Sequence, residues 1–313
     1  SADDWLVLLE RLLQSHDVPP EALAQVTRSV RKVVHRVPAL SAQAATRLVR
    51  AIGVLLKGDK SLLDETVIAL RKALFGHADS AQSAIAGFCE LLRLAAQRMG
   101  GSSSSHRAVD DDDDDSEDDD DDDDDDDEDG HMPRSSQSQR VRSNLAAQRQ
   151  SALVYEGFGL FGRAALLQAP QRACLYSRTA ALAEAEHCFV EPVLLLLERQ
   201  YMAVCDSAVM DGRPPVKLGA LVVDGAVLEP LPALVRAMLR VAVADRCSAC
   251  LSAQRELAGL ARKVVRCGSL LADAPEAATS EDVPLRVAMV RDVLLAMMEV
   301  VVVLGTQQGR EEL

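Results

Sequence analysis

Two cysteines three positions apart, Cys247 and Cys250, are the first candidates for chemistry in this sequence. A Cys-x-x-Cys pair can supply half of a zinc site or form a redox-active dithiol. A zinc site needs a second pair of ligands, and the only further cysteine nearby is Cys267. The chain has seven cysteines, an odd number without framework spacing. The pattern therefore favours reduced thiols in an intracellular compartment over metal or redox chemistry.

Three glycines, Gly157, Gly159 and Gly162, match the G-x-G-x-x-G pattern of dinucleotide-binding proteins. That fingerprint requires a preceding strand and a βαβ unit. The residues before Gly157 have a helical pattern instead, and no βαβ pattern follows. We therefore expect these glycines to let neighbouring helices approach one another closely.

The sequence shows no combination of nucleophile, base and orienting residue that would support catalysis. None of the six histidines has the spacing of a metal ligand, and no phosphate-binding P-loop motif occurs. These patterns predict a protein that is not an enzyme and that uses neither a metal nor a cofactor.

Lys72 is a candidate for modification because of the residues around it. At 100° per residue it lies opposite an apolar stripe on its own predicted helix. The stripe consists of Leu63, Val67, Leu70 and Leu74. The neighbours of Lys72 at i−4 and i+3 are Ile68 and Phe75 rather than charged residues. An ordinary lysine in this setting covers apolar surface with its aliphatic stem. The alternative is a lysine placed where a partner protein docks, with Ile68 and Phe75 as contacts.

Two Ser-Gln dipeptides in tandem, at Ser136 and Ser138, form a second candidate modification site. Ser-Gln is the dipeptide that DNA-damage checkpoint kinases prefer. The four arginines nearby, which contribute a charge of +4, are Arg134, Arg140, Arg142 and Arg149. Two phosphates would add roughly −3 to −4 and cancel that charge. We expect these arginines to contact DNA or the acidic tract described next, and phosphorylation to release them.

The net charge of −14 comes from one segment. Asp110 to Asp129 contains 17 Asp and 2 Glu, so the rest of the chain carries a charge of +5. A mildly basic remainder permits contact with nucleic acid without requiring it. The acidic tract cannot bury apolar surface, so we expect it to be disordered.

Long periodic apolar runs, with 48% hydrophobic but only 3% aromatic residues, favour an all-helical fold. Residues 1–99 read as about five helices that begin roughly every 20 residues, the period of HEAT-like antiparallel pairs in an α-solenoid. Residues 100–138 form a predicted disordered linker. Residues 139–313 form a predicted second helical domain, in which separate helices are expected at 145–154 and 157–167. Within this domain, the pattern of residues 218–227 fits either a short strand pair or a helix turn. The apolar run MMEVVVVLG is expected to be buried inside the stack of helices. No apolar run reaches the length of a membrane span.

The order of several motifs resembles the Fanconi anaemia group I protein family. The segments LRKALF and DSAQSAIAGFCELL are similar to that family's ubiquitin-acceptor helix and its successor, and the Ser-Gln linker follows in the family's position. LVYEGF, FVEPVLLLLERQY, PPVKLGALV and LEPLPALVRAML continue the resemblance in order. It covers most of residues 35–240 and is weaker as far as Val303. The family's linker has more Ser-Gln pairs and no aspartate tract, and its members are several times longer than this chain.

The resemblance implies a central fragment of an α-solenoid, formed by the end of its second solenoid segment and its second helical domain. It implies a nuclear scaffold subunit that pairs with a paralogous Fanconi anaemia subunit and clamps duplex or branched DNA in interstrand crosslink repair. In this reading Lys72 receives ubiquitin from the conjugating machinery, and a checkpoint kinase phosphorylates Ser136 and Ser138. The alternative is an α-solenoid chaperone or transport adaptor that holds basic clients such as histones through the acidic tract.

Overall fold

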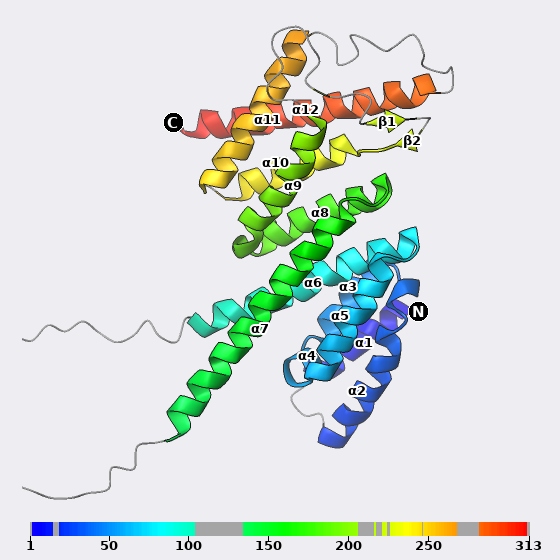
Figure 1. Cartoon of the computed structure of the whole chain (residues 1–313), viewed down its shortest axis with the longest axis vertical. Helices are drawn as coiled ribbons and strands as arrows, with labels where there is room; N and C mark the ends of the chain where they lie inside the picture. Colours follow the sequence, from blue (N-terminus) through cyan, green and yellow to red (C-terminus); the bar gives the residue numbers. More distant parts are fainter. Residues whose placement is uncertain are drawn as a thin grey trace, which may run out of the picture.

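The computed structural model describes the chain except for residues 1, 15–18, 104–133, 206–215, 217–220, 224–225, 246, 268–281 and 312–313. The described residues form twelve α-helices, two short 3₁₀ turns and one pair of two-residue strands (Figure 1). The predicted all-helical fold class is therefore confirmed. None of the described helices combines the length and the apolar character that a bilayer crossing requires.

The first half of the chain supplies six helices and a 3₁₀ turn, η1, at Val37–Ala39. The helices are α1 (Ala2–Gln14), α2 (Pro20–Val34), α3 (Ala42–Ile52), α4 (Leu55–Gly58), α5 (Lys60–Leu74) and α6 (Ala78–Ser103). Ser41 caps α3, since its side chain accepts a hydrogen bond from the Ala44 amide. Proline opens α2, where a missing amide costs nothing.

The second half supplies six more helices and a 3₁₀ turn, η3, at His187–Phe189. The helices are α7 (Arg134–Ala164), α8 (Ala169–Ala185), α9 (Val190–Val204), α10 (Leu231–Ala244), α11 (Ser248–Cys267) and α12 (Asp282–Glu311). Between α9 and α10, β1 (Val222–Val223) and β2 (Ala226–Val227) pair antiparallel, with Val222 opposite Val227. The open choice at residues 218–227 is thus settled in favour of a strand pair.

The helices follow one another along the long axis of the molecule, from α1–α5 at one end through α6, α7 and α8 to α9–α12 at the other (Figure 1). Helix α6 packs against α3, α5 and α8, and α8 packs in turn against α10. Helix α10 then contacts α9, α11 and α12. The buried apolar side chains form one continuous cluster that runs through all these layers.

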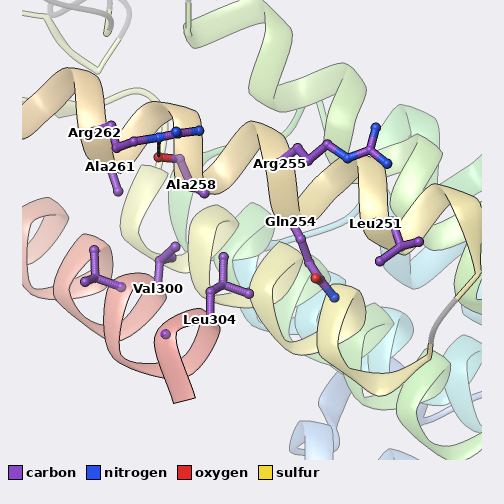
Figure 2. Close-up of a pocket in the computed structure, with 10 residues that line it drawn as sticks. Leu251, Gln254, Arg255, Ala258, Ala261, Arg262, Val300 and Leu304 are labelled. Carbon is purple, nitrogen blue, oxygen red and sulfur yellow. Dashed lines mark hydrogen bonds between the residues drawn. The ribbon is translucent and has the colours of Figure 1, made fainter. Parts of the chain in front are cut away.

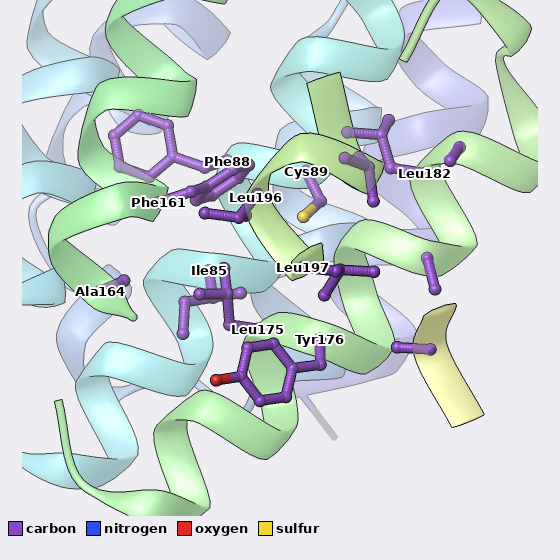
Figure 3. Packing of buried hydrophobic residues seen from close by; sticks show 14 of the residues in the cluster. Ile85, Phe88, Cys89, Phe161, Ala164, Leu175, Tyr176, Leu182, Leu196 and Leu197 are labelled. Carbon is purple, nitrogen blue, oxygen red and sulfur yellow. The ribbon is translucent and has the colours of Figure 1, made fainter. Parts of the chain in front are cut away.

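An aromatic group joins α6, α7 and η3, and Figure 3 shows two of its members, Phe88 and Phe161. Phe88 of α6 meets Phe161 of α7 edge to face, with ring centroids 6.4 Å apart. Phe158 lies 5.7 Å from Phe161 and 5.9 Å from Phe189. Edge-to-face pairs contribute about 1 kcal/mol each beyond the area that they bury. These rings join helices that precede residue 104 to helices that follow residue 133.

The boundaries differ from the sequence prediction at both ends of the expected linker. Helix α6 continues through Ser103. Helix α7 already begins at Arg134, in a stretch of Arg and Gln that tolerates helix well. The rest of the linker, including the aspartate tract, lies outside the described residues. Its disorder and the division of the chain into domains stay predictions.

Two further expectations in the second half are corrected. The sequence pattern suggested separate helices on either side of Tyr155, but α7 passes through this region without a break. The MMEVVVVLG run was expected inside the stack, yet Met298, Val301 and Val302 are more than half exposed. Met297 and Val300 of the same run are buried. Helix α12 lies at one end of the row of helices, so only one of its faces is covered (Figure 1).

Candidate modification surface on α5

The start of α5 is fixed by a capping carboxylate. Asp59 is the N-cap residue, and its Oδ1 accepts a hydrogen bond of 3.0 Å from the Leu62 amide. Arg31 of α2 donates to Asp59 at 2.8 Å and to Glu65 at 2.7 Å. The hydrogen bond from Arg31, followed by that from the Leu62 amide, holds the pKa of Asp59 below its usual value. This cap and the ion pairs attach the first turn of α5 to α2.

The inner face of α5 packs tightly on α6. Val67, Leu70 and Leu74 are buried, as the sequence predicted, whereas Leu63 is only partly buried. A Cβ at Gly87 of α6 would lie 2.6 Å from Leu70 Cδ2, a distance that real side chains do not reach. Gly87 therefore allows the close approach of the two helices.

The end of α5 is also held in place. Phe75 is its C-cap residue, and the amide of Gly76 donates to the Ala73 carbonyl at 3.2 Å. The Ser80 hydroxyl hydrogen-bonds the same carbonyl at 2.9 Å. Since Ser80 is buried in α6, the last turn of α5, which carries Lys72, is attached to the core of the molecule.

Lys72 lies on the outer face of this anchored helix, opposite the buried stripe, and is exposed. Ile68 and Phe75 flank it with exposed fractions of 48% and 49%. Lys72 forms no hydrogen bond or ion pair with the residues that the structure describes. The other four phenylalanines, in contrast, all belong to the aromatic group around α7. The structure thus places Ile68, Lys72 and Phe75 together on one exposed face, as their spacing predicted.

Charge pairing holds α7 beside this face. Arg71 forms an ion pair with Glu156 of α7, and both side chains are substantially exposed. Gly157, the next residue, lies against α6, where an added Cβ would be 3.0 Å from Leu92 Cδ2. The expected close approach is confirmed for Gly157 but wrong for Gly159 and Gly162, which have open space where a Cβ would stand. Sequence analysis did not identify the Arg71–Glu156 pair, because no pattern links residues 85 positions apart.

Exposure alone does not single out Lys72 among the lysines of the chain. The sequence contains six lysines, and Lys32, Lys57 and Lys60 are exposed as well. The residues at i−4 and i+3 of Lys32 in α2 are Arg28 and His35, whereas those of Lys72 are Ile68 and Phe75. A lysine flanked by polar groups gives an approaching protein little apolar surface to bury. The two half-exposed apolar neighbours therefore distinguish Lys72 from Lys32.

The second predicted site falls at the start of α7. Ser136, Ser138 and the four arginines all lie in the first half of this helix, whose backbone is described. The side chains of these serines and of Arg134, Arg140, Arg142 and Arg149 lie outside the described part of the structure. Their role in phosphorylation and in DNA or acidic-tract contact stays a prediction.

A groove of about 530 Å³ lies between α11 and α12, far along the chain from Lys72 (Figure 2). Val300 and Leu304 of α12 face α11 across it, and Arg255 and Arg262 stand on the α11 side. The sequence did not predict this groove, because it depends on how α11 and α12 pack together. In the described residues no group of three or more His, Cys, Asp or Glu side chains is arranged to hold a metal ion.

Comparison with known proteins leaves the family of the chain open. No family model matches it, and no curated protein matches it either. The resemblance to the Fanconi anaemia group I family therefore rests on the ordered motifs quoted from the sequence.

Proposed function

We propose that the chain is a non-enzymatic scaffold that is mono-ubiquitinated on Lys72 as part of a DNA-binding clamp in interstrand crosslink repair. The observation that carries the proposal is the outer face of α5. An exposed lysine stands there between two half-exposed apolar side chains, on a helix anchored at both ends. The anchored helix gives this amine a defined place on the surface, where a conjugating enzyme can reach it. The resemblance to the Fanconi anaemia group I family supports the same residue.

The chemistry at this face requires only the lysine amine. Its deprotonated Nζ attacks the thioester that links ubiquitin to the conjugating enzyme, so that an isopeptide bond forms and the thiol leaves. No carboxylate pairs with Lys72 in the described residues, so docking does not have to break an ion pair first. Ile68 and Phe75 supply apolar surface for the conjugating enzyme, and afterwards for the paralogous partner.

The remaining parts of the proposal concern the helices around α5 and the start of α7. The row of helices corresponds to part of an α-solenoid of HEAT-like pairs in the nucleus. Arg134, Arg140, Arg142 and Arg149 contact DNA, and phosphorylation of Ser136 and Ser138 cancels their charge. DNA binding measured across a salt series checks this part, because the doubly phosphorylated chain should bind more weakly and with a smaller salt dependence.

The test of the acceptor site is a reconstituted ubiquitination reaction with the chain in its native state. Lys72→Arg should abolish mono-ubiquitination, while Lys32→Arg, which alters another exposed lysine with polar neighbours, should leave it unchanged. Arginine keeps both the charge and the helix propensity, so a loss reports on the amine itself. With only six lysines in the chain, mass spectrometry assigns the modified residue directly.

The apolar neighbours provide a second test of the same face. Docking of the conjugating enzyme would bury the exposed part of the Ile68 and Phe75 side chains. Ile68→Ser and Phe75→Ser each remove this apolar surface, so each should weaken docking by about 1 kcal/mol and lower the conjugation rate roughly fivefold. Modification at the wild-type level on another lysine in Lys72→Arg would overturn the acceptor assignment. Unchanged rates in both serine variants would remove Ile68 and Phe75 from the docking surface.

A further inference from the structure

The Cys-x-x-Cys pair lies at the beginning of α11, where the structure gives its two sulfurs different environments. The Leu251 amide donates to the Cys247 carbonyl at 3.1 Å, which makes Cys247 the N-cap residue. The Cys250 amide donates to Cys247 Sγ at 3.4 Å, so the sulfur takes the role that a serine oxygen has in an ordinary cap. The two sulfurs are 3.3 Å apart, and both cysteines are free thiols.

Cys250 is the inner member of the pair. Its side chain is fully buried, and its sulfur hydrogen-bonds the Val241 carbonyl of α10 at 3.6 Å. Burial, the hydrogen bond to Cys247 and the nearby charges of Cys247 and Asp245 raise the pKa of Cys250 to about 12. Cys250 therefore stays protonated while its neighbour is unreacted. Cys247 is only partly buried, so solvent reaches it.

We propose that Cys247 and Cys250 form a redox-active dithiol, in which Cys247 reacts with disulfides from solution and Cys250 resolves the product to an intramolecular disulfide. A solvent-accessible sulfur at the start of a helix can attack a disulfide from solution, since the thiolate is the nucleophile in thiol–disulfide exchange. A buried thiol in contact with it is a suitable resolving group. The site and the reaction are independent of the function proposed for Lys72.

The reaction balances in two exchange steps. Cys247 gives its proton to solvent, and its thiolate attacks one sulfur of a small-molecule disulfide, whose S–S bond breaks and whose other half leaves as a thiolate. The Cys250 thiol then gives up its proton and attacks Cys247 Sγ, which releases the second half as a thiol. One disulfide is thereby reduced to two thiols, and the protein loses two hydrogens.

The backbone at this position already suits the product. Residues three apart in an α-helix have Cα atoms about 5 Å apart, which lies within the range that disulfides span. The bond would close a ring of only four residues, so it would not restrict the rest of the molecule. Gln254 also donates to the Ala242 carbonyl at 2.7 Å, a contact between α10 and α11 that does not involve either sulfur. Oxidation should therefore leave the α10–α11 corner folded.

The experiment uses oxidised glutathione as the probe, with peptide mapping by mass spectrometry under native conditions. All chains carry Cys267→Ser, which removes the other cysteine of α11. In this background the 247–250 peptide should lose two hydrogens and carry glutathione only as a minor species. Cys250→Ser should instead trap a stable glutathione adduct on Cys247, at roughly ten times the level on Cys247 when Cys250 is present. Cys247→Ser, which keeps a good N-cap residue, should leave Cys250 unreacted because it is buried.

Cys188 is a matched control within the same chain, because it is exposed and has no second cysteine in its turn. It should hold a persistent glutathione adduct in every variant, which shows that the oxidant is active. Circular dichroism should show the same helix content in all chains. A persistent adduct on Cys247 when Cys250 is present, or no reaction of Cys247 while Cys188 reacts, would overturn the proposal.

Discussion

Helices α6 and α12 show opposite relations between sequence and burial. Every residue of α6 from Ser83 to Leu92 is buried, although this stretch includes a serine and Glu90. Helix α12 contains the apolar run MMEVVVVLG, yet Val301 and Val302 are 55% and 62% exposed. Hydrophobicity alone would have ranked the two helices in the reverse order.

The neighbours of each helix explain the difference. Helix α6 is covered by α3, α5, α7 and α8, so even its polar side chains are enclosed and must find partners within the protein. Helix α12 packs on α10 and α11 among the described elements, and its outer face remains uncovered (Figure 1). Burial thus follows the position of a helix in the row of helices, which the periodicity of its own sequence does not encode.

The largest expected effect separates two phenylalanines, one at the centre of the molecule and one on the α5 face. Phe88 is fully buried against Phe161, so Phe88→Ala should lower the free energy of unfolding by about 3–5 kcal/mol. Phe75 is half exposed, and Phe75→Ala should cost only about 1 kcal/mol. Urea denaturation of both variants measures the two changes. Equal losses would mean that Phe75 is a core residue rather than part of a docking face.

Two adjacent valines of α12 provide a smaller test of the same comparison. Val300 is completely buried next to α11, and Val300→Ala should cost about 2 kcal/mol through lost burial and an added cavity. Val301→Ala should change stability by less than about 0.5 kcal/mol, because more than half of this side chain is in solvent. Denaturation midpoints of Val300→Ala and Val301→Ala measure the two changes in stability. A similar cost at Val301 would show that its face is covered in solution.

Sequence reasoning found the parts of the structure that local patterns determine. Helical periodicity identified the fold class and placed Lys72 opposite the buried stripe of α5, with Ile68 and Phe75 beside it. It missed features that depend on distant residues, such as the ion pair of Arg71 with Glu156 of α7. For Cys247 and Cys250 the sequence favoured reduced thiols over redox chemistry, and spacing alone shows neither the burial of Cys250 nor the contact between the sulfurs. The exposed face of α12 was missed for the same reason, since the arrangement of the helices decides it.

The smallest expected effect concerns the pH dependence of two buried glutamates. Burial alone would raise the pKa of Glu90 in α6, but hydrogen bonds from Arg93 and Arg50 outweigh it, and the pKa lies below its ordinary value of 4.5. Arg93 donates at 2.6 Å and Arg50 at 2.8 Å. Glu229, just before α10, has one arginine partner, Arg172, and accepts a hydrogen bond of 2.8 Å from Tyr176. For Glu229 the effect of burial outweighs these contacts, so its pKa is raised above the ordinary value.

These opposite shifts give opposite contributions to stability. For Glu90 the folded pKa is the lower one, so its contribution is present above about pH 4.5 and is lost as the pH falls through the folded value. For Glu229 the folded pKa is the higher one, so its contribution is present below about pH 4.5 and is lost as the pH rises through the folded value.

Denaturation of Glu90→Gln and Glu229→Gln between pH 3 and pH 8, each compared with wild type, separates the two contributions. The stability cost of Glu90→Gln should grow by about 1 kcal/mol as the pH rises through the acidic range and then stay constant. The cost of Glu229→Gln should instead shrink as the pH rises above about 4.5, because wild type then has to bury a carboxylate with a single cationic partner. Parallel curves for the two variants would mean that a second arginine does not decide whether a buried glutamate is charged here.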